Sequence, residues 1–161
     1  MKLRVGICED DPFTLATLTA SLSFEQVEVV ISTADPNEVL EQFGKLIPVA
    51  MLIDLHLGDG PTGLDLARSI RARHPEMGIV FLTSFESPRL LDKHFSGFPT
   101  GSQYLNKKDI SSVQQILHAI QKSIAADRKS PQLGSQGVAK LTNRQIEVLK
   151  LIADGYTNNE I

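Results

Sequence analysis

The chain has 161 residues, 42% hydrophobic and 22% charged, a balance typical of a folded globular protein. Its formal net charge of −3 excludes nucleic-acid recognition through overall positive charge, although a small DNA-binding part remains compatible with it. A single cysteine, Cys8, excludes an internal disulfide and a cysteine-rich metal site. The chain lacks a signal region and any apolar run near the roughly 18 residues of a membrane span, so we expect a cytoplasmic protein without a membrane partner.

In chain order, short apolar runs alternate with apolar residues at helical spacing. The runs predict five strands, over residues 3–8, 27–31, 50–53, 79–82 and 103–106. The helical spacings predict helices after them, across residues 15–22, 36–43, 64–70, 87–95 and 110–124. Five repeats of a strand and a helix predict an α/β fold with a parallel sheet covered on both faces.

The periodic pattern ends after Ala125. Residues 127–140 are polar and rich in proline, glycine and serine, which predicts a linker. We therefore expect a first domain over residues 1–126 and a second folded part over residues 141–161.

Acidic residues follow two of the predicted strands. Glu9, Asp10 and Asp11 come directly after the first strand, and Asp54 comes directly after the third. Because ligands bind at the carboxyl ends of parallel strands, which lie about 4.8 Å apart, neighbouring strands would bring these carboxylates together. Their mutual repulsion favours a divalent cation, and oxygen-only ligands suit Mg²⁺. The alternative is a solvated acidic loop in which Asp10 or Asp11 only caps the helix that begins near Pro12.

Four short motifs in this order make the chain resemble the receiver domains of bacterial response regulators. The motifs are VGICEDDP, MLIDLHL, IVFLTS and YLNKKD, each at the end of its own predicted strand. The resemblance covers about residues 1–126. It implies a flavodoxin-like (βα)5 fold with a five-stranded parallel sheet in the order 2-1-3-4-5, and phosphorylation by a partner sensor histidine kinase.

The resemblance also implies a phosphorylation and metal site. Asp54 matches the phosphoacceptor, while Glu9 and Asp10 match the acidic pair that binds Mg²⁺ or Mn²⁺ with it. His56 matches the position whose backbone carbonyl binds the metal, so its side chain has no implied role. The family catalyses at most its own phosphorylation and dephosphorylation, so we do not expect an enzyme with a separate substrate.

Three further residues match the family's switch. Thr83 matches the hydroxyl that hydrogen-bonds the phosphoryl group, and Lys107 matches the lysine that neutralises its charge. Tyr104 matches the aromatic residue that turns inward when the hydroxyl moves. Taken singly, each has a plain structural explanation, as a β-branched strand residue, a surface lysine and an edge-strand aromatic.

Residues 141–161 resemble the opening of a LuxR-type helix-turn-helix domain of the NarL/FixJ class. Thr142 with Gln145 forms one capping box, and Thr157 with Glu160 forms another after the glycine that ends the first helix. A generic amphipathic helix would not predict the second box. The family reads DNA with its third helix, so we expect specific DNA binding from the full-length protein and not from this fragment. The resemblance also implies a homodimer upon phosphorylation.

Two departures from the family pattern concern loops. Gly58 stands four residues after Asp54, where the family usually has proline. The stretch from Thr83 to Lys107 is about two residues longer than typical and contains Pro88 and Pro99. We therefore expect the helix over residues 87–95 to be short or displaced.

Three rival functions make different demands on the residues at the ends of the predicted strands. A haloacid-dehalogenase-type phosphatase needs an aspartate two residues after its nucleophile, where this chain has His56. A flavodoxin needs a loop rich in serine, threonine and glycine after the first strand, where this chain has three acidic residues. A receiver-like module that acts by protein contacts without phosphorylation stays open as the alternative.

Overall fold

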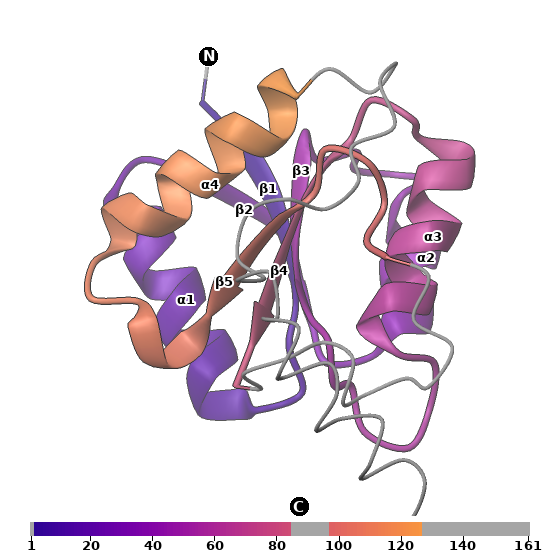
Figure 1. Ribbon diagram of the computed structural model, residues 1–161, viewed down its shortest axis with the longest axis horizontal. Coiled ribbons are helices and arrows are strands. Elements are labelled where there is room, and N and C mark those ends of the chain that lie inside the picture. Colours follow the sequence, from indigo (N-terminus) through magenta and orange to yellow (C-terminus); the bar gives the residue numbers. More distant parts are fainter. Residues whose placement is uncertain (1, 85–96, 127–161) are drawn as a thin grey trace, which may run out of the picture. The chain divides into compact units, whose positions relative to one another are not determined.

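A computed structural model describes residues 2–84 and 97–126 of the chain. They form a five-stranded parallel sheet in the order β2-β1-β3-β4-β5 (Figure 1), which confirms the fold and strand order implied by the resemblance. The strands are β1 (Arg4–Cys8), β2 (Glu28–Thr33), β3 (Ala50–Asp54), β4 (Gly78–Thr83) and β5 (Gln103–Asn106).

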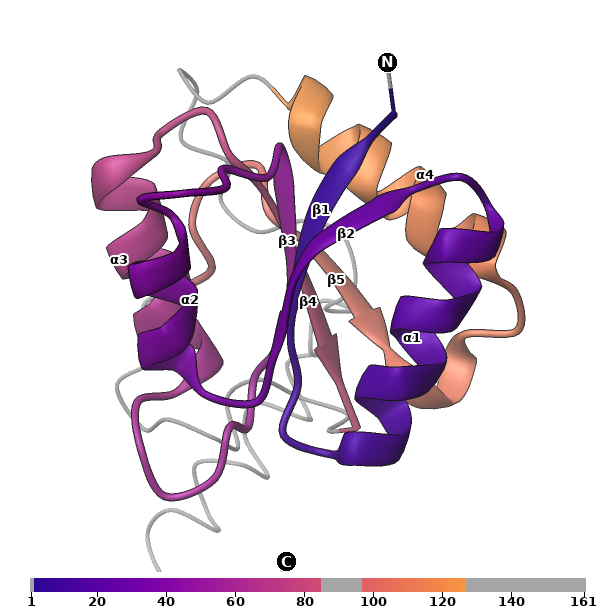
Figure 2. The same ribbon diagram turned by 180° about the vertical axis from the view of Figure 1, so that it is seen from behind.

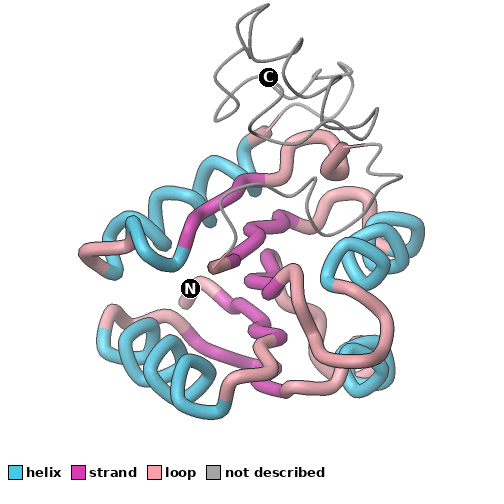
Figure 3. The backbone as a smooth tube through the Cα atoms, turned by 60° about the horizontal axis from the view of Figure 1, so that its bottom comes forward, coloured by secondary structure: helices cyan, strands magenta, loops and turns pink. Residues whose placement is uncertain are grey.

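Helices cover both faces of this sheet in the described part of the chain. They are α1 (Pro12–Phe24), α2 (Pro36–Gln42), α3 (Gly63–Arg73), the 3-10 helix η2 (Lys107–Asp109) and α4 (Val113–Ala125). The helices α2 and α3 lie on one face and α1 and α4 on the other, as Figure 1 and, from behind, Figure 2 show. Figure 3 shows the strands as a central layer between the two helical layers.

Several predicted segments lie outside the described residues: the helix over residues 87–95, the linker 127–140 and the fragment 141–161. Within residues 2–84 and 97–126, none of the helices combines the length and the apolar character needed to cross a bilayer.

Polar caps fix where the first two helices begin. Asp11 accepts a hydrogen bond from the backbone N–H of Thr14 at 2.7 Å, and Asp35 accepts one from Asn37 at 2.8 Å. A proline follows each aspartate, and its fixed φ suits the first helical position. The capping role that the sequence left open between Asp10 and Asp11 therefore belongs to Asp11.

The central strands are buried on both faces. Every residue of β3 and β4 is buried, as expected for parallel strands beneath helices. The layer beneath α2 and α3 includes Met51, Ile53, Ile79 and Phe81. The layer beneath α1 and α4 includes Leu52, Val80, Leu82 and Ile120. Burying one such side chain contributes about 1.5–3 kcal/mol, so these two layers hold the sheet in place.

The strand β2 continues two residues past the predicted end at Ile31. Ser32 and Thr33 extend the ladder because they pair with the last two residues of β1. Thr33 is buried although polar, and its hydroxyl donates a hydrogen bond to the Glu38 carboxylate. The apolar run therefore ends before the backbone pairing does. A strand end predicted from apolar residues alone comes two residues too early.

Gly63 allows α3 to begin directly against the end of β3. A Cβ at this position would lie 1.9 Å from the carbonyl oxygen of Asp54 and 2.8 Å from its carbonyl carbon. The backbone N–H of Gly63 also donates to the carbonyl of Leu55 at 3.0 Å. Only glycine fits this approach, because backbone atoms cannot move aside as a flexible side chain would.

We expect Gly63→Ala to lower the free energy of unfolding by roughly 1–3 kcal/mol or more, the range of an overpacked core. Gly60→Ala is the matched control, because a Cβ there has no heavy atom within 4 Å; it should change stability by less than about 0.5 kcal/mol. Urea unfolding of both variants measures the difference. Equal stabilities would contradict the close approach of α3 to β3.

Candidate functional site

Acidic residues from two strand ends meet at the carboxyl edge of the sheet. Cys8 of β1 pairs in register with Ile53 of β3, so Glu9 and Asp54 are the next neighbours along the two strands. Together with Asp10, each offers a carboxylate oxygen, and these oxygens lie within 4.8 Å of one another. Glu9 and Asp54 are buried, whereas Asp10 is exposed. The structure thus brings together the carboxylates that the strand order predicts to converge.

Lys107 joins the two buried carboxylates. Its Nζ lies 2.6 Å from Glu9 Oε2 and 2.6 Å from Asp54 Oδ2. Burial works against the charged ammonium, but hydrogen bonds to Asp54 and to Glu9 outweigh it and raise the pKa of Lys107. The lysine is therefore a fixed positive charge in this site, although 53 residues separate it from Asp54 in the sequence.

The Glu9 carboxyl group is unfavourably placed when it is ionised. Burial raises its pKa to about 7, against an ordinary value of 4.5; Lys107 lowers it in part and the nearby charge of Asp54 raises it. Glu9 Oε1 also accepts a hydrogen bond from the backbone N–H of Asp11 at 3.2 Å. Two buried carboxylates and one ammonium leave the cluster with excess negative charge, which a cation would neutralise.

Asp54 is held through both of its carboxylate oxygens. Oδ1 accepts a hydrogen bond from the backbone N–H of His56 at 3.0 Å, and Oδ2 accepts one from Lys107. The residue is buried to 6% exposure. His56 itself is exposed, and its backbone N–H, not its side chain, reaches the site. Metal binding by its carbonyl stays a prediction.

Thr83 and Tyr104 lie on the strands next to Asp54. Thr83 ends β4 one residue beyond Leu82, the register partner of Asp54, and is fully buried. Tyr104 on β5 is the register partner of Phe81 and is half-buried. Burial and, to a lesser degree, the charge of Asp109 raise the pKa of its phenol. The topology therefore places Thr83 at the edge that carries the carboxylates, and Tyr104 two positions further back.

Asn106 is a supporting residue that the sequence analysis missed. Its side chain caps η2 by accepting a hydrogen bond from the backbone N–H of Lys108 at 3.0 Å. The capped turn starts at Lys107 and so fixes the backbone from which the ammonium reaches Asp54. An asparagine directly before a short polar run is a capping signal, which could have identified this role.

The backbone conformation of Gly58 explains why this position differs from the family pattern. Its φ is +76°, in the left-handed region. Proline has φ fixed near −65°, so it could not occupy this position without a change of the loop. The glycine therefore belongs to a different loop conformation after Asp54.

The chain was compared with known proteins. The model for the response regulator receiver domain matches residues 5–121. The response regulator protein VraR of Staphylococcus epidermidis is 29% identical over 177 aligned positions, which cover 100% of this chain and 80% of VraR. The transcriptional regulatory protein LiaR of Bacillus subtilis is also 29% identical, with 99% of this chain and 80% of LiaR covered.

Solved structures share the fold. A response regulator receiver domain from Methanospirillum hungatei has a TM-score of 0.62 at 23% identity, covering 77% of this chain and 94% of that one. A structure of the two-component response regulator RcsB in complex with DNA has a TM-score of 0.63 at 25% identity, covering 99% of this chain and 81% of RcsB.

The raised pKa of Glu9 predicts a pH dependence of stability in the presence of a chelator. Folded Glu9 keeps its proton up to about pH 7, while the unfolded chain loses it near 4.5. Folding therefore takes up a proton between these values, and the contribution of Glu9 to the free energy of unfolding falls as the pH rises through this window.

Urea unfolding at several pH values, with wild type and Glu9→Gln in EDTA, measures this contribution. The variant cannot ionise at position 9 and should lose less stability than wild type between about pH 5 and pH 7. Parallel curves for the two proteins would show that Glu9 has an ordinary pKa in the fold.

Proposed function

Because the chain belongs to the family of response regulator receiver domains, we propose that Asp54 accepts a phosphoryl group from a sensor histidine kinase. One observation carries this proposal: a buried aspartate carboxylate is held between the backbone N–H of His56 and the Lys107 ammonium. An oriented carboxylate beside a positive charge is what a carboxylate nucleophile needs.

Phosphoryl transfer to Asp54 requires that the reacting groups be positioned and that negative charge be neutralised. A carboxylate oxygen of Asp54 forms a bond to phosphorus, while the bond from phosphorus to the histidine nitrogen of the kinase breaks and that nitrogen keeps the electron pair. The His56 N–H orients the carboxylate before the reaction. The Lys107 ammonium, 2.6 Å from Asp54, stabilises negative charge that arrives with the phosphoryl oxygens.

The acidic cluster would hold Mg²⁺ or Mn²⁺ in this proposal, through Glu9, Asp10 and Asp54 with the backbone carbonyl of His56. The residues fit the ion, because three carboxylate oxygens lie within 4.8 Å and only oxygen donors are involved. Burial and the charge of Asp54 raise the pKa of Glu9, and a bound cation would offset both. When bound, the cation supplies further neutralisation of the phosphoryl oxygens.

Phosphorylation would act as a switch through Thr83 and Tyr104. The Thr83 hydroxyl, at the same edge of the sheet as Asp54, donates a hydrogen bond to a phosphoryl oxygen. Its movement leaves space that the Tyr104 ring fills from the neighbouring strand. A modification that adds up to two negative charges thus becomes a change of surface shape.

The output in the full-length protein would be regulation of transcription. LiaR is a transcriptional regulatory protein by name, and RcsB was solved in complex with DNA. For this chain, DNA binding by a LuxR-type domain that starts within residues 141–161, homodimerisation on phosphorylation and a cytoplasmic location stay predictions. Catalysis would be limited to the chemistry of its own Asp54.

Incubation with Mg²⁺ and acetyl phosphate, followed by intact-mass measurement, tests the phosphoacceptor. Wild type should gain the mass of one phosphoryl group, and Asp54→Asn should gain none because the amide is not a nucleophile. Asp59→Asn removes an exposed aspartate from the following loop and should react as wild type does. A wild type without an adduct would favour the module that acts by protein contacts alone.

Thermal unfolding with and without Mg²⁺ tests the cation site. An ion that binds the folded state raises the melting temperature of wild type, and chelation reverses the rise. Asp10→Asn should reduce the rise while leaving the fold intact, because Asp10 is exposed. Glu41→Gln on α2 removes one exposed charge away from the cluster and should keep the full rise. The same rise in all three proteins would place the ion elsewhere.

A further inference from the structure

Three aromatic rings form a continuous stack on the α2 and α3 face of the sheet. Phe81 of β4 and Tyr104 of β5 are register partners. Phe98 contacts both: its ring centroid lies 4.6 Å from that of Phe81 at 31°, and 5.6 Å from that of Tyr104 at 36°. These separations fall in the range of favourable aromatic pairs. Because Phe81 is fully buried, it anchors the stack in the core.

Phe98 reaches this position from a segment outside the helices and strands. Gly97 has φ +103° and Gly101 has φ +78°, both in the left-handed region. A turn over residues 99–102, which includes Gly101, is closed by a hydrogen bond from Ser102 N–H to the Pro99 carbonyl at 3.0 Å. The segment that carries Phe98 is therefore flanked by two glycines. Its ring is positioned by packing against other side chains, and not by a helix or strand.

The stack shares Tyr104 with the proposed switch, and Phe81 lies close to Thr83. Phe81, the partner of Tyr104, precedes Thr83 by two residues on the same strand, so both side chains face the same side of β4. A Tyr104 ring that fills space beside Thr83 must move along the strands towards the carboxyl edge. Because Phe98 packs on Phe81, two residues behind Thr83 on β4, a Tyr104 ring that moved level with Thr83 would separate from Phe98.

We propose that Phe98 is a positioning residue that holds the Tyr104 ring away from Thr83 and thereby opposes phosphorylation of Asp54. This inference rests on the proposed function. Phe98 stabilises the resting position of the ring by a contact that the phosphorylated state lacks. By linkage, whatever stabilises the resting state weakens the binding of a phosphoryl group or its analogue to the same extent.

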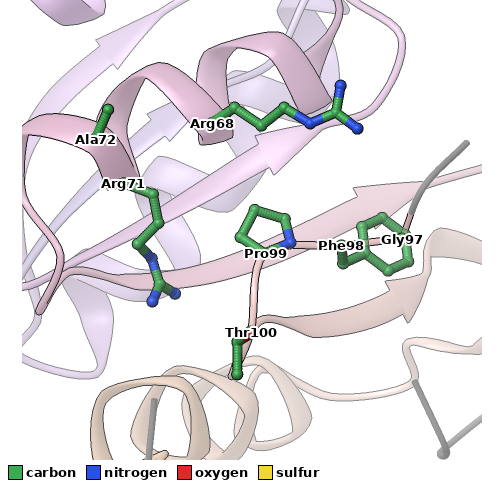
Figure 4. Close-up of a pocket in the computed structure, with 7 residues that line it drawn as sticks. All are labelled: Arg68, Arg71, Ala72, Gly97, Phe98, Pro99 and Thr100. Atoms are coloured by element: carbon green, nitrogen blue, oxygen red, sulfur yellow. The ribbon is translucent and has the colours of Figure 1, made fainter. Parts of the chain in front are cut away.

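The same contact connects the switch to a pocket on the surface. Phe98 and Pro99 line a hollow of about 490 Å³ together with Arg68 and Arg71 of α3. Figure 4 shows both arginines projecting from α3 on either side of Pro99, with Phe98 beyond it. A ring movement at Tyr104 removes one side of the support for Phe98, so the wall of this pocket changes with the state of Asp54.

Tyrosine fluorescence can report on the Tyr104 ring alone. The chain has two tyrosines and no tryptophan, so Tyr156→Phe leaves Tyr104 as the sole tyrosine. In this background Phe98→Ala should increase the acrylamide quenching of Tyr104 in the unphosphorylated protein, because one ring face loses its cover. Phe98→Leu, which keeps an apolar side chain there and adds no second tyrosine, should increase the quenching by less than Phe98→Ala does. Phe24→Ala, which removes a phenylalanine that is 88% exposed, is the matched control and should not change it.

Calorimetric titration with beryllofluoride and Mg²⁺, a phosphoryl analogue, measures the coupling. Phe98→Ala should bind the analogue roughly two- to tenfold more tightly than the parent, the range that one aromatic contact supplies. Phe98→Leu keeps the apolar volume without the ring and should shift the affinity in the same direction by less. Phe98→Tyr and Phe24→Ala should bind as the parent does.

The outcomes separate the two proposals. Equal affinities of the parent and Phe98→Ala for the analogue would overturn the role of Phe98 while leaving phosphorylation in place. Weaker binding of the analogue by both the alanine and the leucine variant would overturn that role as well. Unchanged quenching in Phe98→Ala would overturn it without any use of the analogue. A parent protein that neither binds the analogue nor takes a phosphoryl group would instead overturn the proposed function, and the inference with it.

Discussion

The contact of one ammonium with two buried carboxylates is the interaction on which this site depends. Lys107 lies 2.6 Å from both Glu9 and Asp54, and its charge offsets part of the repulsion between these acids at neighbouring strand ends. Removing a buried charge from such a cluster leaves the others uncompensated, which costs far more than an exposed ion pair contributes. The remaining negative charge, shared with exposed Asp10, is the physical reason to expect a cation here.

The sheet provides the geometry for this contact. Its order puts β3 between β1 and β4, so the acids after β1 and at the end of β3 become neighbours, and the end of β4 lies beside them. The two buried layers make the strands rigid, and the close approach at Gly63 leaves the backbone of Asp54 little room to move. The Asp54 carboxylate thus lies on a fixed frame, while Glu9, Asp10 and Lys107 follow directly after the ends of other strands.

The strand β5 carries residues of both the charged site and the proposed switch. The strand ends in the cap that positions Lys107, and it carries Tyr104 two residues earlier. In our proposal, charge added at Asp54 is sensed by Thr83 and Lys107, whereas the aromatic stack of Phe81, Phe98 and Tyr104 sets how readily the surface responds. In this proposal the charged groups of the site determine where the phosphoryl group binds. The weaker aromatic contact sets the equilibrium between the resting and the switched state.

The sequence by itself determined the alternation of strands and helices, the α/β class and the acidic residues at strand ends, because periodicity, proline and acidic caps act within a few residues of one another. It also identified Asp54, Thr83, Tyr104 and Lys107 through motifs at successive strand ends. Only the tertiary structure decided that Asp11 and not Asp10 caps α1, that Glu9 is buried with a raised pKa, and that Phe98 covers Tyr104. The cap is a local contact, but two adjacent aspartates offer it equally and only the backbone conformation distinguishes them. The burial of Glu9 and the place of Phe98 against Phe81 depend on residues distant in the chain, and no local pattern encodes such neighbours.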